Sequence, residues 1–484
     1  MAADFTFSWF EVLLFVLAGY LLIYGRFFRN RHINLPPGPK GWPVIGSLLQ
    51  CGKQVPIKFH EWSQIYGDVF SVKLGTELVV VLGSHDAIKE AFVKKSESFA
   101  ERPKRWSLSI ATKNKGITTP WPEWKHTRKF IVRTFRELGA GKQVMEERVC
   151  AESDILVEYI VNNKPTDLTR VIYNAVSNVL CSELFGTRFR YDDDDFKILM
   201  KTMSLNVSAI TDANILTFFP LLWYLPTSLK SKFLALQSAL ASYVENRIKE
   251  CRQAMHGGDP DSVAEAFLQR DDWDDGKIGD LAQIGKGLLN AGADTTASVL
   301  MWAILYLAMN PEIQEKCYSE IAHVVGDEAH VRMRNRSKLP YIEATCLEIY
   351  RCSTVSPLGV PHGTTTDVDL YGYRIPEDTM VLGSLWSVHM DEKMWPSPRE
   401  FKPERFLDAN GEVVNRERVI PYGLGSRDCL GSELAKMEVL IFTTRLIQKF
   451  KFKLPSGCVA PPMHGKFEFV RHPHPYDVIS EARH

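Results

Sequence analysis

One cysteine near the C-terminus lies in a setting that gives it chemistry. Cys429 stands in the stretch YGLGSRDCLG, residues 422–431, and an amphipathic helical pattern begins at Ser432. Glycines allow the backbone to come close to a flat ligand, and unpaired N–H groups at a helix start favour a thiolate over a thiol. A thiolate held in this way suits the iron of a haem, because it pushes electrons toward O–O cleavage. The alternative is a helix-capping loop around a buried structural cysteine.

A run of small residues forms the second candidate site. Residues 289–298 read LNAGADTTAS inside a long helical pattern that continues through Leu305. Gly292 and the hydroxyl side chains can open the helical hydrogen-bond ladder. Asp294 and Thr295 would then form an acid–alcohol pair that relays protons to bound oxygen. The alternative is a seam where helices pack closely, with a polar rim.

Three charged residues are expected to support the cysteine loop and not to react. Glu348 and Arg351 stand three residues apart on a helix, where they can pair on one face. Arg405 lies in the proline-bounded stretch FKPERF, residues 401–406. A carboxylate shared by two guanidinium groups can lock distant segments together. The alternative is a solvated surface pair that contributes little.

Donors for carboxylates lie in WKHTR, residues 124–128. Trp124 and Arg128 stand one helical turn apart and can both reach groups such as haem propionates. Trp121 with Arg128 is the competing pair if the helix has another register, and an ordinary amphipathic helix start remains open. His362 and Arg102 are weaker propionate candidates that spacing alone does not select.

The elements that position these residues follow from composition and periodicity. The chain has 484 residues, is 45% hydrophobic and has a formal net charge of zero, so no basic surface indicates a nucleic-acid partner. Its nine cysteines contain no CxxC pair, which argues against a disulfide framework or a zinc site and favours a reducing compartment. Strand-like runs at residues 69–74 and 78–82 resemble a hairpin, and helical periodicity dominates from about residue 124. We expect a mainly α domain with small β-sheets.

The N-terminus predicts a membrane anchor. Residues 7–28 are almost wholly apolar, and three arginines at 26, 29 and 31 follow them. A cleaved signal peptide would carry its basic residues before the apolar run, so a retained single transmembrane helix is favoured over a cleaved signal or a peripheral helix. The positive-inside rule places the N-terminus in the lumen and the body in the cytosol. The apolar residues 215–226 either dip into the bilayer or form a buried corner.

Five motifs occur in an order that resembles the cytochrome P-450 superfamily: WxxxR, AGxDTT, ExxR, PERF and the cysteine loop. The whole chain is similar to microsomal, animal-type members of the drug- and steroid-metabolising group. The resemblance implies the cytochrome P-450 fold, with an anchor at 1–30, a proline-rich hinge at 31–45 and a haem-thiolate monooxygenase domain at 46–484. It makes Cys429 the axial ligand and metal ligand of haem b (iron protoporphyrin IX), and Asp294 and Thr295 the oxygen-activating pair. The implied propionate contacts are Arg102, Trp124, Arg128, His362 and Arg427.

The implied reaction inserts one oxygen atom from O2 into an apolar small molecule: a steroid, a fatty acid or a xenobiotic. No dinucleotide-binding fingerprint is evident, so the resemblance implies electrons from NADPH through NADPH–cytochrome reductase, with cytochrome b5 as a further candidate partner. It also implies a single-pass protein of the endoplasmic reticulum membrane, in contact with membrane lipid. Substrate contacts are expected near residues 106–117, 205–214, 289–296 and 355–360.

The cysteine loop departs from the family at Tyr422, where phenylalanine is usual, and at Ser426 and Asp428. The extra hydroxyl needs a partner and can tune the iron's potential, and Asp428 can weaken the docking of an acidic electron donor. Two other functions stay open. One is an oxygen-independent isomerase or dehydratase of peroxides, which does not need the acid–alcohol pair. The other is a non-enzymatic haem binder or membrane adaptor.

Overall fold

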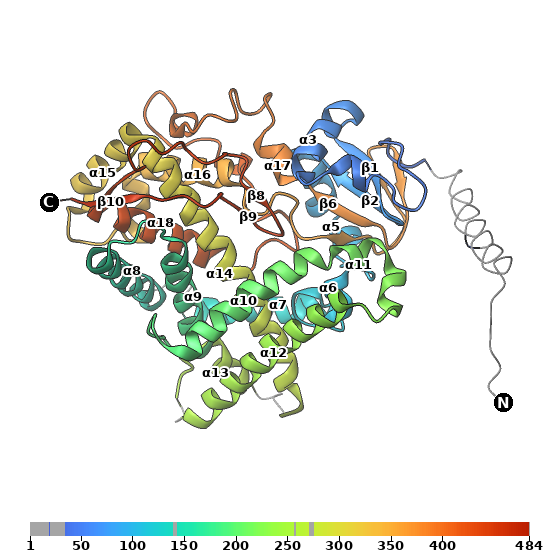
Figure 1. Ribbon diagram of the computed structural model, residues 1–484, viewed down its shortest axis with the longest axis horizontal. Coiled ribbons are helices and arrows are strands. Elements are labelled where there is room, and N and C mark those ends of the chain that lie inside the picture. The colour runs from blue at the N-terminus through green and yellow to red at the C-terminus, as the bar shows by residue number, and fades with distance from the viewer. Residues whose placement is uncertain (1–18, 20–33, 139–142, 256–257, 271–274, 484) are drawn as a thin grey trace.

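Helices make up most of the molecule, and small sheets lie beside them (Figure 1). The structure, a computed structural model, describes residues 19, 34–138, 143–255, 258–270 and 275–483. The predicted anchor, apart from Gly19, and residues 31–33 of the predicted hinge lie outside the described residues. The architecture confirms the expected mainly α fold with small β-sheets.

Nine long helices, among the residues described, form the body of the protein. They are α7 (Trp121–Leu138), α8 (Gln143–Asn163), α9 (Thr169–Phe185), α10 (Asp194–Asp212), α12 (Ser228–Ala254), α14 (Ile278–Met309), α15 (Pro311–Val325), α16 (Pro340–Ser353) and α18 (Ser432–Lys449). The shorter helices are α2 (Leu48–Cys51), α3 (Val55–Tyr66), α4 (His85–Lys89), α5 (Ser96–Phe99), α6 (Ser107–Ala111), α11 (Asn214–Phe218), α13 (Val263–Leu268) and α17 (Leu385–His389). The brief π and 3-10 segments are η1 (Glu90–Lys94), η2 (Gly116–Thr118), η3 (Pro220–Tyr224), η4 (Asp275–Lys277), η5 (Met333–Lys338), η6 (Pro403–Phe406) and η7 (Arg416–Arg418).

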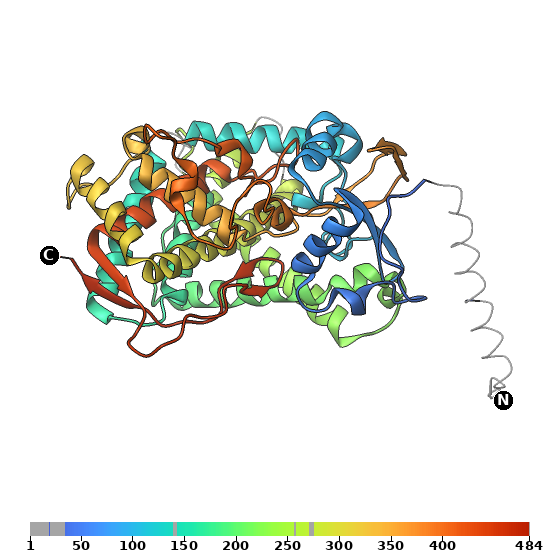
Figure 2. The same ribbon diagram turned by 90° about the horizontal axis from the view of Figure 1, so that it is seen from above.

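The largest sheet lies at the end of the molecule opposite the C-terminus (Figure 2). Its order is β1-β2-β6-β3, formed by β1 (Val69–Leu74), β2 (Glu77–Leu82), β6 (Met380–Gly383) and β3 (His362–Gly363). Strands β1 and β2 form an antiparallel hairpin in which Val69 faces Leu82, as the sequence predicts. The two-stranded sheets are β4 (Val368–Leu370) with β5 (Tyr373–Ile375), β7 (Phe450–Lys453) with β10 (Ile479–Ala482), and β8 (Lys466–Phe467) with β9 (Arg471–His472).

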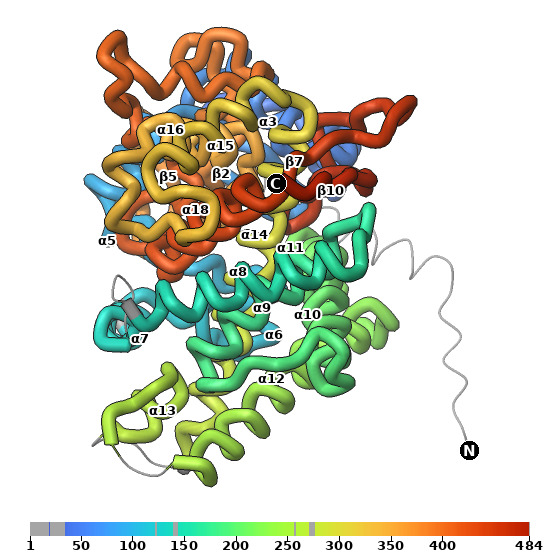
Figure 3. The backbone as a smooth tube through the Cα atoms, turned by 90° about the vertical axis from the view of Figure 1, so that its left-hand side faces the viewer, coloured from blue at the N-terminus to red at the C-terminus, as the bar shows by residue number. Residues whose placement is uncertain are grey.

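Helix α14 is the central element of the core. It runs between α16 and α18 on one side and α10 and α12 on the other (Figure 3). Every residue from Thr296 to Ala308 is buried, which explains why this half is apolar all round. Of the helices described, α14 alone is long and apolar enough to cross a membrane, but 78% of its most apolar window is buried inside the protein. It is therefore a core helix, and it ends where Asn310 precedes Pro311 of α15.

All nine cysteines lie in the described part of the chain and are free thiols. Seven are buried, and only Cys429 and Cys458 are exposed. Burial raises the pKa of the buried thiols, for example to about 12 for Cys181 and to about 11 for Cys251. These seven therefore serve as small apolar side chains in the core.

Candidate active site

A cavity of about 320 Å³ lies between the cysteine loop and the middle of α14. All eight site residues that the sequence selects line it: Arg102, Trp124, Arg128, Asp294, Thr295, His362, Arg427 and Cys429. They come from segments more than three hundred residues apart, so the fold brings them together as expected.

The cysteine loop has the tight backbone that its glycines predict. Gly425 has φ +86°, and a Cβ atom there would lie 1.8 Å from the Phe92 carbonyl oxygen. The Cys429 N–H donates to the Tyr422 carbonyl at 2.8 Å, and α18 begins at Ser432, as predicted. Cys429 is exposed to the cavity, yet desolvation by the surrounding protein raises the pKa of its thiol, although the Gly431 N–H opposes this. A metal ion bound at the sulfur would favour the thiolate form.

Of the departures in this loop, Asp428 has a compensating partner, whereas the buried Tyr422 hydroxyl has no hydrogen-bond partner among the residues described. The ring of Tyr422 packs edge-on against Tyr350, with centroids 5.6 Å apart. Burial and the neighbouring Tyr350 hydroxyl raise the pKa of Tyr422 well above its ordinary value, so its phenol stays neutral. Arg128 donates to the Asp428 carbonyl at 2.7 Å and also binds the Asp428 carboxylate. The charge of Asp428 is thus balanced by Arg128.

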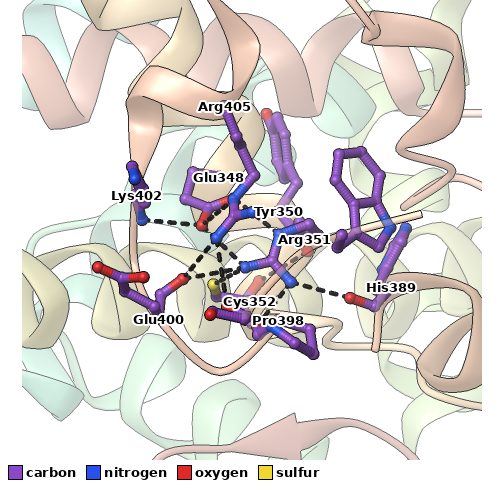
Figure 4. Close-up of polar contacts among 12 residues, drawn as sticks. Glu348, Tyr350, Arg351, Cys352, His389, Pro398, Glu400, Lys402 and Arg405 are labelled. Carbon is purple, nitrogen blue, oxygen red and sulfur yellow. Dashed lines mark hydrogen bonds and ion pairs between the residues drawn. The ribbon is translucent and has the colours of Figure 1, made fainter. Parts of the chain in front are cut away.

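The buried ion pairs around Glu348 join α16 to η6 (Figure 4). Arg351 donates from Nε and Nη2 to the two carboxylate oxygens of Glu348 at 2.7 and 2.8 Å. Arg405 Nε donates to Glu348 Oε1 at 3.0 Å, and so does the Lys402 N–H at 2.9 Å. Neither Glu348 nor Arg351 is exposed. The predicted arrangement of one carboxylate between two arginines is confirmed.

His389 connects the ion pairs around Glu348 to the cysteine loop, and no sequence pattern indicated this contact. Arg351 Nη1 donates to the His389 carbonyl at 2.8 Å. Since Thr354 Oγ1 donates to the Arg351 carbonyl, the His389 Nδ1–H donates to Thr354 Oγ1 at 2.9 Å. Its Nε2 then accepts from the Ile420 N–H at 3.1 Å, next to the start of the loop. Burial lowers the pKa of His389 to about 3, so the ring stays neutral and this chain of contacts is maintained.

A group of buried cationic side chains lines one edge of the cavity. Arg427 donates from Nε to the Ala100 carbonyl at 2.7 Å and from Nη2 to the Thr119 carbonyl at 2.8 Å. Arg102 donates to the Pro361 carbonyl at 2.6 Å. The buried Arg427 Nη1 and Arg102 Nε have no hydrogen-bond partner among the residues described. Burial lowers the pKa of both guanidinium groups, to about 10 for Arg427.

The tryptophans and His362 complete this edge. The Arg427 guanidinium lies 5.4 Å from the Trp121 ring centre and 5.6 Å from that of Trp124. Both indoles therefore lie beside the same cation, and the choice between them as propionate donor stays a prediction. The His362 ring stacks on Phe92 at 3.8 Å between centroids, and burial lowers its pKa well below the ordinary value.

The acid–alcohol pair on α14 has an unforeseen partner. Asp294 Oδ2 lies 3.4 Å from Nε2 of His472 on β9, a contact that no local sequence pattern indicated. Although burial lowers the pKa of His472, the neighbouring Asp294 carboxylate raises it overall. Thr295 Oγ1 donates to the Ala291 carbonyl at 2.7 Å. A Cβ on Gly292 would come within 2.9 Å of Leu180, so the packing-seam interpretation also holds at this position.

These residues fit an iron porphyrin. A sulfur ligand lines the cavity, and the small residues of α14 leave room for a flat ring. The two buried guanidinium groups have orphaned N–H donors and only carbonyl acceptors. Such groups require anionic partners, and the two propionates of haem would supply them.

The comparison with known families agrees with this geometry. The sequence model of the family described as Cytochrome P450 matches residues 36–480. The chain belongs to the cytochrome P450 family. This P450 is 34% identical to cytochrome P450 2U1 of Mus musculus, over 97% of the chain and 95% of the relative. It is 33% identical to cytochrome P450 2D3 of Rattus norvegicus over 93% of each, and 32% identical to cytochrome P450 1A1 of Canis lupus familiaris over 88% and 86%. It is a monooxygenase of a haem-dependent family, as the resemblance implied.

Proposed function

We propose that this P450 binds haem b through Cys429 and inserts one oxygen atom from O2 into an apolar small molecule: a steroid, a fatty acid or a xenobiotic. Electrons come from NADPH through a reductase, and cytochrome b5 is a second candidate donor. The observation that supports the proposal is that Cys429 and the Asp294–Thr295 pair line one cavity. Haem, when bound, supplies the activation of dioxygen, and the protein supplies its ligand, the proton route and the substrate site.

The residues have distinct proposed roles. Arg102, Arg427, His362 and Trp124 hold the propionates, and Arg128 contributes there while it neutralises Asp428. On α14, Thr295 holds a proton at Oγ1. Asp294 resupplies that proton from solvent, where His472 is its neighbour. The Glu348 group keeps the cysteine loop in register through His389.

The membrane topology is also proposed: residues 1–30 anchor the chain in the endoplasmic reticulum membrane with the N-terminus in the lumen, residues 31–45 form the hinge, and residues 46–484 form the cytosolic catalytic domain. The described part supports membrane contact. Leu221 is 76% and Tyr224 85% exposed, and Leu49 and Trp42 are similarly exposed. The turn after β1 joins the segment near Trp42 and Leu49 to the segment near Leu221 and Tyr224. Its Gly75 N–H donates to the Ile45 carbonyl, and its Thr76 N–H donates to the Phe218 carbonyl. This apolar surface suits the membrane interface.

Two substitutions test the chemistry. Cys429→Ser abolishes the thiolate-type Soret band of the reduced, carbon-monoxide-bound protein, and an unchanged band would show that another group ligates the iron. Thr295→Ala uncouples NADPH consumption from product formation in the presence of reductase, whereas Thr202→Ala on the exposed face of α10 leaves the coupling unchanged. Unaffected coupling in Thr295→Ala, together with turnover of a peroxide without reductase, would favour the isomerase alternative.

A further inference from the structure

An uncompensated lysine lies in the wall of the cavity, two helical turns before the proposed proton-relay residues. Lys286 on α14 is only 4% exposed, and it lines the same cavity as Cys429. Its ammonium has three N–H donors but one hydrogen-bond partner among the described residues, Gln237 Oε1 at 2.9 Å. Burial lowers the pKa of Lys286 to about 8. The site therefore holds a buried cation without an anion, which is costly for the folded protein.

The neighbours of Lys286 are neutral amides that fix its position. Gln237 of α12 donates to Asn206 Oδ1 at 3.0 Å, and Asn290 of α14 donates to the same oxygen at 2.9 Å. Asn206 of α10 in turn donates to the Leu236 carbonyl at 3.0 Å. These side-chain amides are neutral, so none of them can supply the missing negative charge. The network joins the three helices that cover this part of the cavity.

No carboxylate of the cavity wall, within the described ranges, pairs with Lys286. Burial raises the pKa of Glu438 well above the ordinary value, which favours its neutral form. The other three have cationic partners: Glu183 with Arg148, Asp294 with His472, and Asp428 with Arg128. Lys115, the other lysine of the cavity wall, pairs with Asp280. Lys286 is therefore a cation whose anion must come from a ligand.

The position of Lys286 indicates how such a ligand would lie. Lys286, Asn290 and Asp294 recur every four residues, so they follow one face of α14. Eight residues of helix span about 12 Å. The walls beside this path are largely apolar and include Ile117, Val207 and Ile210. A ligand with an anionic head on Lys286 can thus extend an apolar body along the helix toward Asp294.

We propose that the substrate is an anionic amphiphile whose carboxylate or sulfate head binds Lys286 Nζ and whose apolar body reaches the oxidation site beside Asp294 and Thr295. This rests on the proposed monooxygenase function and names its substrate class. Two sources of such a head group are a fatty acid and a steroid sulfate.

The test compares charged ligands with their uncharged parents in the full-length haem-bound protein. Dodecanoate is titrated against 1-dodecanol, and dehydroepiandrosterone sulfate against dehydroepiandrosterone, with binding measured from the spectral shift when the iron's water is displaced. In the wild type, we expect the anion of at least one pair to bind about tenfold or more tightly than its parent alcohol, or about 1.4 kcal/mol. The pair in which the anion binds more tightly identifies the head group as that of a fatty acid or of a steroid sulfate.

Substitutions of Lys286 test whether this residue causes the preference for the anion. Lys286→Gln keeps a donor for Gln237 but removes the charge, so the anion loses about tenfold in affinity while the alcohol stays within about twofold. Lys286→Met provides a second charge-free variant. Lys249→Gln, which breaks an exposed ion pair with Glu245 on α12 outside the cavity, is the control, and its preference for the anion equals that of the wild type. The spectrum of the carbon-monoxide complex reports whether each variant is folded.

Equal binding of anion and alcohol by the wild type would overturn the proposal, and so would an anion preference that survives in both Lys286 variants. Failure of the proposed function looks different. A missing thiolate-type band in the wild type, or no product from any bound ligand with reductase present, would refute the monooxygenase role. Binding at Lys286 would then be compared by isothermal titration calorimetry, which does not depend on the iron.

Discussion

Replacing Glu348 by glutamine tests whether the buried ion pairs stabilise the haem site. Glu348 accepts hydrogen bonds from Arg351 Nε, Arg351 Nη2, Arg405 Nε and the Lys402 N–H. In Glu348→Gln, one of the two oxygens becomes an NH2 donor that faces a guanidinium group. Two cations are then buried with no carboxylate between them.

The magnitude follows from burial. Removing one partner of a buried pair leaves an uncompensated charge and costs about 3–5 kcal/mol, whereas an exposed pair contributes about 0–1 kcal/mol. Glu348 and Arg351 are fully buried, so we expect the free energy of unfolding to fall by the larger amount. Because the network reaches Ile420 through His389, the cysteine loop loses its order before the rest of the fold does.

The assay follows two signals during urea denaturation: the thiolate-type Soret band of the carbon-monoxide complex and tryptophan fluorescence. In the variant, we expect the Soret band to disappear at a lower urea concentration than the fluorescence transition. Glu137→Gln removes the partner of Arg133 in an exposed pair and serves as the control, with no measurable change. A loss of stability below about 1 kcal/mol in Glu348→Gln, the range of surface pairs, would refute the reasoning.

Three further outcomes are expected. The pKa of His472 is raised above its ordinary 6.5, so its pairing with Asp294 stabilises the fold fully below pH 6.5, and this contribution is lost as pH rises through the raised pKa. In His472→Phe, the urea midpoint should not show this fall with rising pH. Gly425→Ala places a Cβ 1.8 Å from the Phe92 carbonyl oxygen, so the haem content measured by absorbance should fall strongly. In the control Gly279→Ala, the added methyl meets no other atom, and the haem content should not change. Tyr224→Asp, in a chain without residues 1–33, should reduce vesicle binding in flotation; unchanged binding would exclude this surface from membrane contact.

Local patterns in the sequence predicted much of the site. The cysteine loop could be predicted because its glycines and the helix start at Ser432 lie within about ten residues of each other. The pairing of Glu348 with Arg351 could be predicted because the two residues lie one helical turn apart. The hairpin of β1 and β2 follows from two alternating runs around a short turn. In each case the interaction lies within a segment whose geometry the residue types determine.

The partners that join distant segments were not predictable. His472 meets Asp294 across nearly one hundred and eighty residues of chain, and His389 accepts a hydrogen bond from Ile420, which lies 31 residues further along. Neither histidine stands in a motif. The amides around Lys286 come from three helices, so their common cavity is a property of tertiary packing. Side-chain chemistry could be recognised from sequence, whereas its contacts required the fold.

The distribution of thiols has a practical consequence for spectroscopy. Seven cysteines are buried, and the sulfur of Cys429 faces the cavity where the haem is proposed to bind. Cys458, between β7 and β8, is then the remaining accessible thiol. Since alkylating reagents attack accessible thiolates, the native sequence should accept one spin label or fluorophore without cysteine replacement. Such a probe would report the distance from the β7–β10 end of the protein to a membrane or to a docked reductase.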